Sequence, residues 1–164
     1  MTGVHAAVAI DLDRALVDTR PLWQDWLDSA AAVLGADARA LPADRADAAA
    51  ELDLHGPGNW LALLERYCED RVAVYVRRDA ETSDALRSLA AAGWEIGAFT
   101  DAPEPLARVA LAQIGADRRI GMLAAGAGAL ELLRASLGED VLVVSSPQEL
   151  MAAADAARSS GRDS

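Results

Sequence analysis

The chain has 164 residues, of which 52% are apolar, and its formal net charge is −11 at pH 7. This length suits one domain, or a core domain with a small insertion, and it excludes a large multidomain assembly. Acidic residues outnumber basic ones by 26 to 15, so electrostatic repulsion disfavours nucleic acid and anionic membranes as partners. All 15 basic residues are arginines, and the chain contains no lysine.

Neither cysteine chemistry nor a membrane span is indicated. The lone Cys68 excludes an internal disulfide and a cysteine-cluster metal site. No apolar run approaches the ~20 residues of a membrane span, and the first residues lack the basic and apolar segments of a signal peptide. We therefore expect a cytoplasmic protein.

The first predicted element is a buried strand, "HAAVAI" at 5–10, which runs directly into Asp11 and Asp13. An amphipathic helix is predicted from Pro21 to Gly35, because its apolar residues recur at helical spacing between a proline start and a glycine stop. Burying charge is costly, so two acids at the end of a buried strand indicate either a polar loop or a site that uses their charge.

The next stretch is predicted to be helical. We expect a helix near 44–53 and another that begins after Asn59, whose side chain can cap it. The segment "VAVYV" at 72–76 is compatible with a strand or with an extended lead into the helix that follows, which ends at Gly93.

Strands then alternate with helices about a dozen residues long, a pattern typical of a parallel sheet with right-handed crossovers. We predict an α/β fold with a Rossmann-like parallel sheet formed by residues 1–17 and 79–157. A helical cap at 18–78 is inserted after the first strand, and 158–164 is expected to be a disordered tail. The later predicted strands are 94–100, 119–123 and 141–145, and the later helices 102–114, 127–137 and 148–157.

Ligands in open parallel sheets bind beyond the carboxyl ends of the strands. That edge should therefore gather Asp11, Asp13, Thr100 and Asp101, with 124–126 and 145–146 nearby. One carboxylate there can attack a substrate while the other donates a proton, or both can hold Mg²⁺ through oxygen.

The stretch "VAIDLDRALVDTRPLW", then a helical insertion, then "GAFTDAPEP", resembles the haloacid dehalogenase superfamily, in its phosphoglycolate-phosphatase-like branch. The resemblance covers about residues 6–157. It implies that Asp11 is the nucleophile that forms an aspartyl phosphate and binds Mg²⁺. It also implies that Asp13 is the general acid/base with its carbonyl on the metal, and that Thr100 hydrogen-bonds the phosphoryl oxygens.

Three departures from the family pattern stand out. Arg14 and Ala15 replace the Gly-Thr that usually follows the first motif, so a cation stands where a small turn is expected. It either binds an anion or fills the entrance to the site. The third motif should offer a lysine or arginine, but none stands at the expected place; Arg118, Arg119 and Arg134 would each need an altered geometry.

The fourth motif should carry acids for Mg²⁺, yet here it reads "SSPQEL". Ser145 and Ser146 replace Gly-Asp, Leu150 replaces the second acid, and Glu149 is a weak substitute metal ligand. Asp101 adds a carboxylate beside Thr100. It is predicted to cap the 102–114 helix, with metal ligation or repulsion of the phosphate as the alternatives.

Three hypotheses follow. The chain is a catalytically degenerate member that acts as a binding or regulatory module, or an active Mg²⁺-dependent phosphatase on a small phosphorylated metabolite, or a structural domain that binds a protein partner. Loss of one preorganised hydrogen-bond donor to the transition state lowers a rate by ~10² to 10³. Because this chain lacks both the third-motif cation and the fourth-motif acids that bind Mg²⁺, the degenerate hypothesis is favoured.

Overall fold

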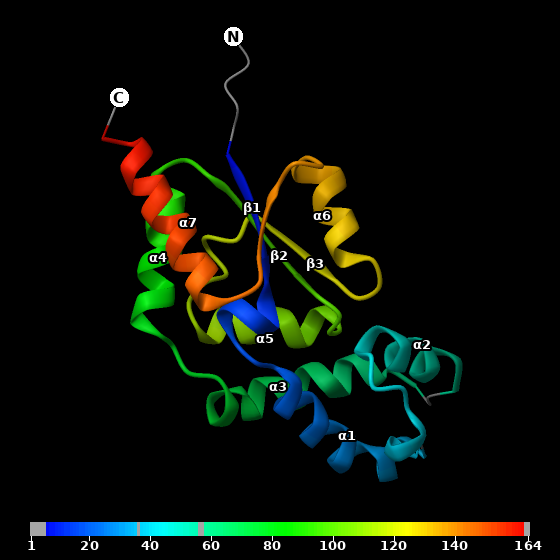
Figure 1. Cartoon of the computed structure of the whole chain (residues 1–164). Helices are drawn as coiled ribbons and strands as arrows, with labels where there is room; N and C mark the ends of the chain where they lie inside the picture. Colours follow the sequence, from blue (N-terminus) through cyan, green and yellow to red (C-terminus); the bar gives the residue numbers. More distant parts are fainter. Residues whose placement is uncertain (1–5, 36, 56–57, 163–164) are drawn as a thin grey trace.

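A computed structural model describes residues 6–35, 37–55 and 58–162, and it has an α/β architecture around a four-stranded, all-parallel sheet (Figure 1). The order across the sheet is β3-β2-β1-β4, so the first strand is central. The fold class predicted from the strand and helix alternation is therefore confirmed. The strands are β1 (Ala7–Asp11), β2 (Glu95–Thr100), β3 (Met122–Ala125) and β4 (Leu142–Val144).

Helices cover both faces of the sheet, as the buried sequence of β1 requires. Val8 and Ile10 face the larger core and Ala9 the smaller one, and all three side chains are fully buried. The smaller core lies under α6 (Ala129–Leu137), and on the opposite face α4 and α7 pack against each other (Figure 1). The helices of the larger-core side are α4 (Ala80–Ala91), α5 (Glu104–Gln113) and α7 (Pro147–Ser160).

The residues expected to form the cap build a layer of helices beyond the carboxyl ends of the strands, with α5 between this layer and the sheet (Figure 1). The rings of Trp23, Trp26 and Trp60 pack against one another in its interior in tilted orientations, with centroids 5.2 Å apart for the first pair and 5.9 Å for the second. We call this part the helical layer. Its helices are α1 (Arg20–Leu34), the 3-10 turn η2 (Ala38–Ala40), α2 (Arg45–His55) and α3 (Trp60–Tyr75).

A single π-helical turn, η1 (Leu12–Leu16), follows β1 directly, and the sequence did not predict it. The Val17 amide donates to the Leu12 carbonyl at 3.0 Å, which closes the wide turn. Two residues of the turn, Leu12 and Ala15, are buried in the core. The turn therefore anchors the segment that carries Asp13 and Arg14, and π-helical turns of this kind are frequent at functional sites.

Several predicted boundaries were wrong. The segment 72–76 is neither strand nor extended lead, because α3 continues to Tyr75 with Val72 buried in its packed face. The expected tail is helical as far as Ser160, while 163–164 lie outside the described residues, as do residues 1–5. The third strand begins at Met122 rather than at 119. Within the described ranges, no helix is long and apolar enough to cross a membrane.

Gly97 allows α6 to pack closely on the sheet, and this contact generates a stability prediction. A Cβ at Gly97 would lie 2.9 Å from Leu137 Cδ1 and 3.0 Å from Leu133 Cδ2, and Leu133 is fully buried. We expect Gly97→Ala to lower the free energy of unfolding by about 1–3 kcal/mol through overpacking, measured by urea denaturation.

The matched control is Gly121→Ala, since a Cβ at Gly121 would meet only the Ile96 carbonyl at 3.8 Å. That substitution should change the free energy of unfolding by no more than about 0.5 kcal/mol. Equal losses in the two variants would contradict the proposed close packing of α6 on β2.

Candidate functional site

The sequence-predicted residues at the strand ends lie together. Asp11 ends β1, Thr100 ends β2, and the two strands are parallel neighbours with Asp11 opposite Phe99. Asp11, Asp13, Thr100 and Asp101 line one cavity of about 400 Å³ at this edge. We call it the strand-end cavity.

Both carboxylate oxygens of Asp13 are occupied by hydrogen bonds. Oδ1 accepts from the backbone amide of Thr19 at 3.0 Å and from the Thr19 hydroxyl. Oδ2 accepts from the Thr100 hydroxyl at 2.7 Å and from Arg45 Nη2 at 2.6 Å. The Asp13 side chain is only 9% exposed, so these partners replace water around its charge.

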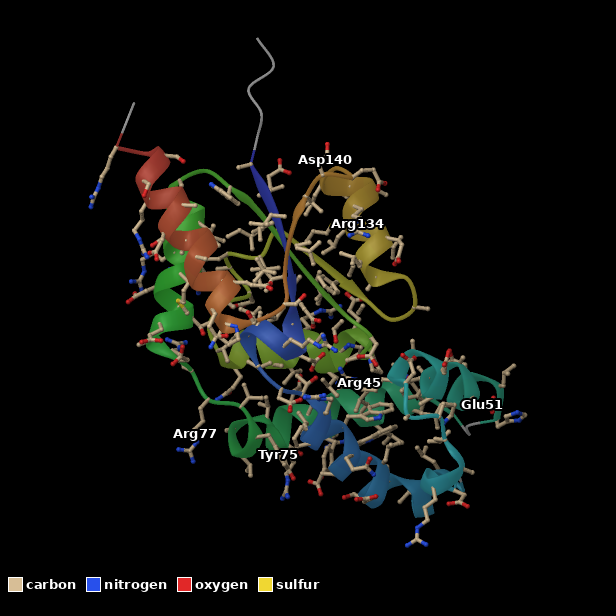
Figure 2. The ribbon with its side chains drawn as sticks, in the orientation of Figure 1. Arg45, Glu51, Tyr75, Arg77, Arg134 and Asp140 are labelled. Carbon is tan, nitrogen blue, oxygen red and sulfur yellow. The ribbon has the colours of Figure 1, made fainter. Side chains whose placement is uncertain are left out.

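The main partner of this carboxylate is Arg45, which sequence reasoning missed. It is the first residue of α2, and its side chain is only 3% exposed. Figure 2 shows it where the helical layer meets the strand ends, whereas Glu51 lies farther along the same helix. Nη1 donates to the Thr19 hydroxyl at 2.7 Å, and Nη2 bridges Asp13 to Asp101.

Asp101 does not cap α5 as predicted. The N-cap of α5 is Pro103, and no side chain accepts a hydrogen bond there. Asp101 Oδ1 instead accepts from Arg45 Nη2 at 2.7 Å and from Nε at 3.1 Å, and Oδ2 accepts from the Arg45 backbone amide at 3.1 Å. Asp101 thus binds both the guanidinium of Arg45 and the backbone amide of Arg45, the first amide of α2. Because its oxygens are used in this way, Asp101 does not cap α5.

The electrostatics of Asp101 reflect this partner. Partial burial alone would raise the pKa of Asp101, but the hydrogen bonds and the positive charge of Arg45 outweigh it, so its pKa lies below the ordinary value. Asp101 is therefore ionised while Arg45 is in place.

Asp11 behaves in the opposite way. Burial, and then the negative charge of Asp13, raise the pKa of Asp11, and the amide and charge of Arg14 oppose this only in part. Arg14 Nε lies 3.8 Å from Asp11 Oδ2, and the Arg14 side chain is 72% exposed at the cavity wall. Asp11 thus has one longer ion pair, with an exposed arginine, in place of the close contacts that Arg45 makes to Asp13 and Asp101.

Glu149, the predicted weak metal ligand, lies elsewhere and has another role. Its Oε2 accepts from the Ser145 amide at 2.7 Å, and its own amide donates to the Ser146 hydroxyl at 3.1 Å. This reciprocal arrangement caps the start of α7. Glu149 is not part of the strand-end cavity, and the pattern Ser-x-x-Glu before α7 was the sequence signal for its capping role.

The strand ends offer few free carboxylate oxygens to Mg²⁺ in this arrangement. A hard dication needs several oxygen ligands, but the carboxylates of Asp13 and Asp101 are already engaged by Arg45 and the two threonine hydroxyls, which leaves the Asp11 carboxylate beside the backbone carbonyl of Asp13. Across residues 6–35, 37–55 and 58–162, no group of three or more His, Cys, Asp or Glu side chains is arranged to hold a metal ion. The Arg45 guanidinium lies between the carboxylates of Asp13 and Asp101.

A second cavity, of about 420 Å³, opens on the helical-layer side of the same ion pairs. Trp23, Leu27 and Leu41 form its apolar part. Arg20, Arg45 and Asp101 line both this cavity and the strand-end cavity, so the two cavities adjoin at Arg45 and its partners.

Arg45 could not be found from sequence spacing. It stands 32 residues from Asp13 and 56 from Asp101, in an Ala- and Asp-rich stretch without a motif. No protein-family model matches the chain, and no curated protein is significantly similar to it.

The buried ion pairs generate a stability prediction. We expect Arg45→Met to lower the free energy of unfolding by about 3 kcal/mol, because it leaves Asp13 buried without its counter-charge. Urea denaturation measures the loss. In the double variant with Asp13→Asn, the two effects should be strongly non-additive.

The matched control is Arg71→Met. Arg71 Nη2 lies 3.6 Å from Asp25, and the Arg71 side chain is 49% exposed, so its loss should matter much less. Arg45→Met with a loss no larger than Arg71→Met would show that the buried pairs contribute little.

The two pKa directions predict opposite pH effects. The pKa of Asp101 is lowered in the folded protein, so its stabilisation is present above the unfolded pKa and is lost as the pH falls through the folded one. The pKa of Asp11 is raised, so its ionisation opposes folding once the pH exceeds the unfolded value.

At pH 7 we therefore expect Asp101→Asn to destabilise the protein and Asp11→Asn to stabilise it, with both differences from the wild type shrinking toward pH 3. Urea denaturation between pH 3 and pH 7 tests this. If the two substitutions changed the free energy of unfolding in the same direction at pH 7, the opposite pKa directions of Asp101 and Asp11 would be refuted.

Proposed function

We propose that this chain is a haloacid-dehalogenase-like protein that has lost phosphoryl transfer and acts as a binding or regulatory module. In this proposal the Arg45 guanidinium takes over the charge compensation that Mg²⁺ and the third-motif cation supply in active members. The observation that carries it is the pair of contacts from the buried Arg45 Nη2 to Asp13 and to the partly exposed Asp101, at 2.6 Å and 2.7 Å.

Asp13 is central to this argument. A general acid/base must be able to reach the leaving group and exchange its proton, whereas each oxygen of Asp13 is held by two donors within the protein. Thr100, the expected partner of the phosphoryl oxygens, donates its hydroxyl hydrogen to the same carboxylate. The groups expected to act on a phosphoryl group are thus bound to one another.

The remaining departures support the same proposal. The chain has no lysine, and Glu149 caps α7 rather than facing the strand-end cavity. Arg14 and Arg20 remain exposed at the cavity wall, although Arg20 is paired with Asp18. Such cations favour a small phosphorylated metabolite, held there without hydrolysis.

A second candidate is an active Mg²⁺-dependent phosphatase on such a metabolite. One observation favours it: Asp11 lines the strand-end cavity, and within residues 6–35, 37–55 and 58–162 its nearest cationic atom is the Arg14 Nε at 3.8 Å. This candidate requires Arg45 to leave Asp13 and Asp101 before the reaction.

The two candidates predict different outcomes in a hydrolysis assay. We expect no Mg²⁺-dependent release of p-nitrophenol from p-nitrophenyl phosphate, and none from a panel of sugar phosphates and phosphoglycolate, above the level of an Asp11→Asn control. Metal-dependent turnover that this control abolishes would overturn the proposal and establish the phosphatase.

A companion measurement tests the role of Arg45 itself. Mg²⁺ should leave the melting temperature of the wild type unchanged but raise that of Arg45→Ala, because the substitution frees the Asp13 and Asp101 carboxylates for the cation. Arg71→Ala serves as the matched control and should not respond. If Arg45→Ala is too unstable, Arg45→Gln removes the charge while retaining hydrogen-bond donors. A wild-type response equal to that of the Arg45 variants would contradict the replacement.

A further inference from the structure

A second concave site lies away from the strand-end cavity and shares no lining residue with it. It is a hollow of about 680 Å³ between the lead into α4 and the connection from α5 to β3. Arg78, Arg118 and Arg119 line it, with Asp117 as the one acid among its lining residues. We call it the arginine hollow.

The charge of this hollow contrasts with that of the whole chain. Its lining carries three arginines and one aspartate, whereas the protein has a net charge of −11. In the described part of the chain, no ion pair or hydrogen bond involves the side chains of Arg78, Arg118 or Arg119. Their donors are therefore free to bind a ligand.

One of these guanidinium groups lies close to the backbone at the end of α5. Gly115 has a φ of +71°, and a Cβ added there would lie 2.5 Å from Arg78 Nη2 and 2.9 Å from its Cζ. The guanidinium of Arg78 thus lies against bare backbone. The helix end does not need this cation, because the amides of Gly115 and Ala116 already satisfy the carbonyls of Ala112 and Leu111.

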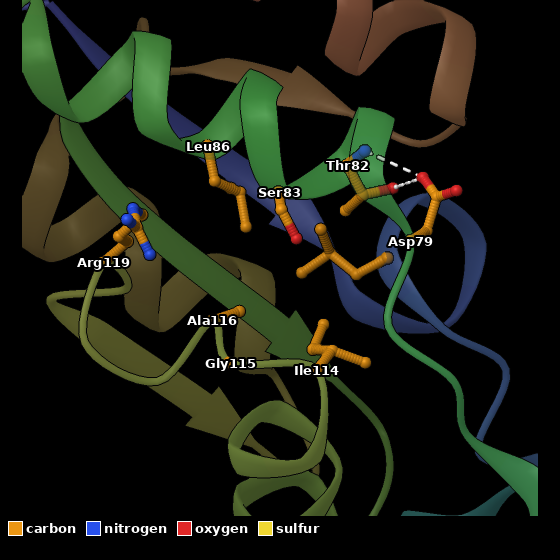
Figure 3. Close-up of a pocket in the computed structure, with 9 residues that line it drawn as sticks. Asp79, Thr82, Ser83, Leu86, Ile114, Gly115, Ala116 and Arg119 are labelled. Atoms are coloured by element: carbon orange, nitrogen blue, oxygen red, sulfur yellow. Dashed lines mark hydrogen bonds between the residues drawn. The ribbon is translucent and has the colours of Figure 1, made fainter.

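A smaller cavity adjoins the arginine hollow and adds polar groups to it. Gly115 and Arg119 line both spaces. Figure 3 shows Ser83 on α4 directed into the smaller cavity, while the Thr82 hydroxyl is turned to Asp79 by a hydrogen bond of 2.8 Å. The Ser83 hydroxyl and the carboxylate of Asp79 thus line the smaller cavity together with Arg119, and the three arginines of the hollow remain its main charged groups.

We propose that the arginine hollow binds a small, multiply charged phosphate-type anion, of the diphosphate class. The planar fork of an arginine matches phosphate oxygens, and guanidinium groups around one hollow can engage several of them at once. A volume of about 680 Å³ lies within the range of small-ligand sites.

The size of the anion follows from the charge distribution. At physiological ionic strength, charges are screened beyond about 8 Å, so a small anion inside the hollow senses mainly the local arginines. A nucleic acid or an anionic membrane extends over much more of the surface and meets the acidic residues that give the chain its charge of −11. The hollow therefore favours a small ligand over an anionic polymer or bilayer.

Isothermal titration of the full chain with pyrophosphate tests the proposal. We expect saturable binding that weakens by about 10-fold or more in Arg119→Gln and in Arg118→Gln, and that weakens as salt is raised. The matched control is Arg134→Gln, whose arginine is well separated from this region on α6 (Figure 2) and should leave the affinity unchanged.

A second variant tests the geometry at constant charge. Gly115→Ala should displace the Arg78 guanidinium and weaken pyrophosphate binding, with circular dichroism verifying that the variant is folded. Absence of binding by the wild type, or equal losses in Arg134→Gln, would overturn the proposal. So would tighter binding of a single-stranded oligonucleotide or of phosphatidylserine vesicles than of pyrophosphate.

The test also separates this site from the proposed function. Arg14→Gln alters only the strand-end cavity, so it should leave the binding event that depends on Arg118 and Arg119 unchanged, and any weaker binding in the strand-end cavity appears as a separate event. A loss of all pyrophosphate binding that is confined to Arg14→Gln would locate the anion in the strand-end cavity and refute the arginine hollow. Phosphatase activity, if found, would overturn the proposed function alone, because the two cavities share no lining residue.

Discussion

The Arg45 guanidinium, buried between Asp13 and Asp101, is the interaction on which the rest of the structure depends. It joins the helical layer to the ends of β1 and β2 through bonds of 2.6 Å and 2.7 Å. Removing these charges from water carries a desolvation cost of several kcal/mol per ion, which only close pairing and full hydrogen bonding can offset. The two threonine hydroxyls complete that bonding, and no buried side-chain polar atom among the described residues lacks a partner.

This arrangement links architecture to chemistry. The same bonds that hold α2 against the sheet use the oxygens that a metal ion or a phosphoryl group would need. A site cannot offer these oxygens to a ligand and also keep the helical layer fixed by them. The proposed loss of phosphoryl transfer follows from this competition. Asp11 takes no part in the contacts of Arg45, and its one ion pair is the longer contact with the exposed Arg14.

Much of the fold could be predicted because it depends on local patterns. Alternating strand and helix periods, with glycines at helix ends, gave the parallel sheet, and the strand-end rule brought Asp11, Asp13, Thr100 and Asp101 together. Local propensity failed at 72–76, where the valines are typical of a strand but the packed face of α3 continues through Val72.

The errors at the site have a different origin. Asp101 was predicted to cap the helix that follows it, but it pairs with the buried guanidinium of Arg45, 56 residues away. No spacing in the sequence indicates this pair. Glu149 was considered as a metal ligand, although the adjacent Ser-x-x-Glu pattern indicated a helix cap. Arg45 carried no sequence signal at all, because its role exists only once the helical layer has docked.

The contacts of Arg45 join segments 32 and 56 residues apart, and this separation has a consequence for the order of folding. Closing such long loops is entropically costly and is rewarded only after the sheet and the helices exist. Interactions made late, after the transition state, mainly slow unfolding rather than accelerate folding. The contacts of Arg45 are therefore expected to lengthen the time for which the helical layer stays docked on the core, together with the packing of α3 on α5, rather than to speed its formation.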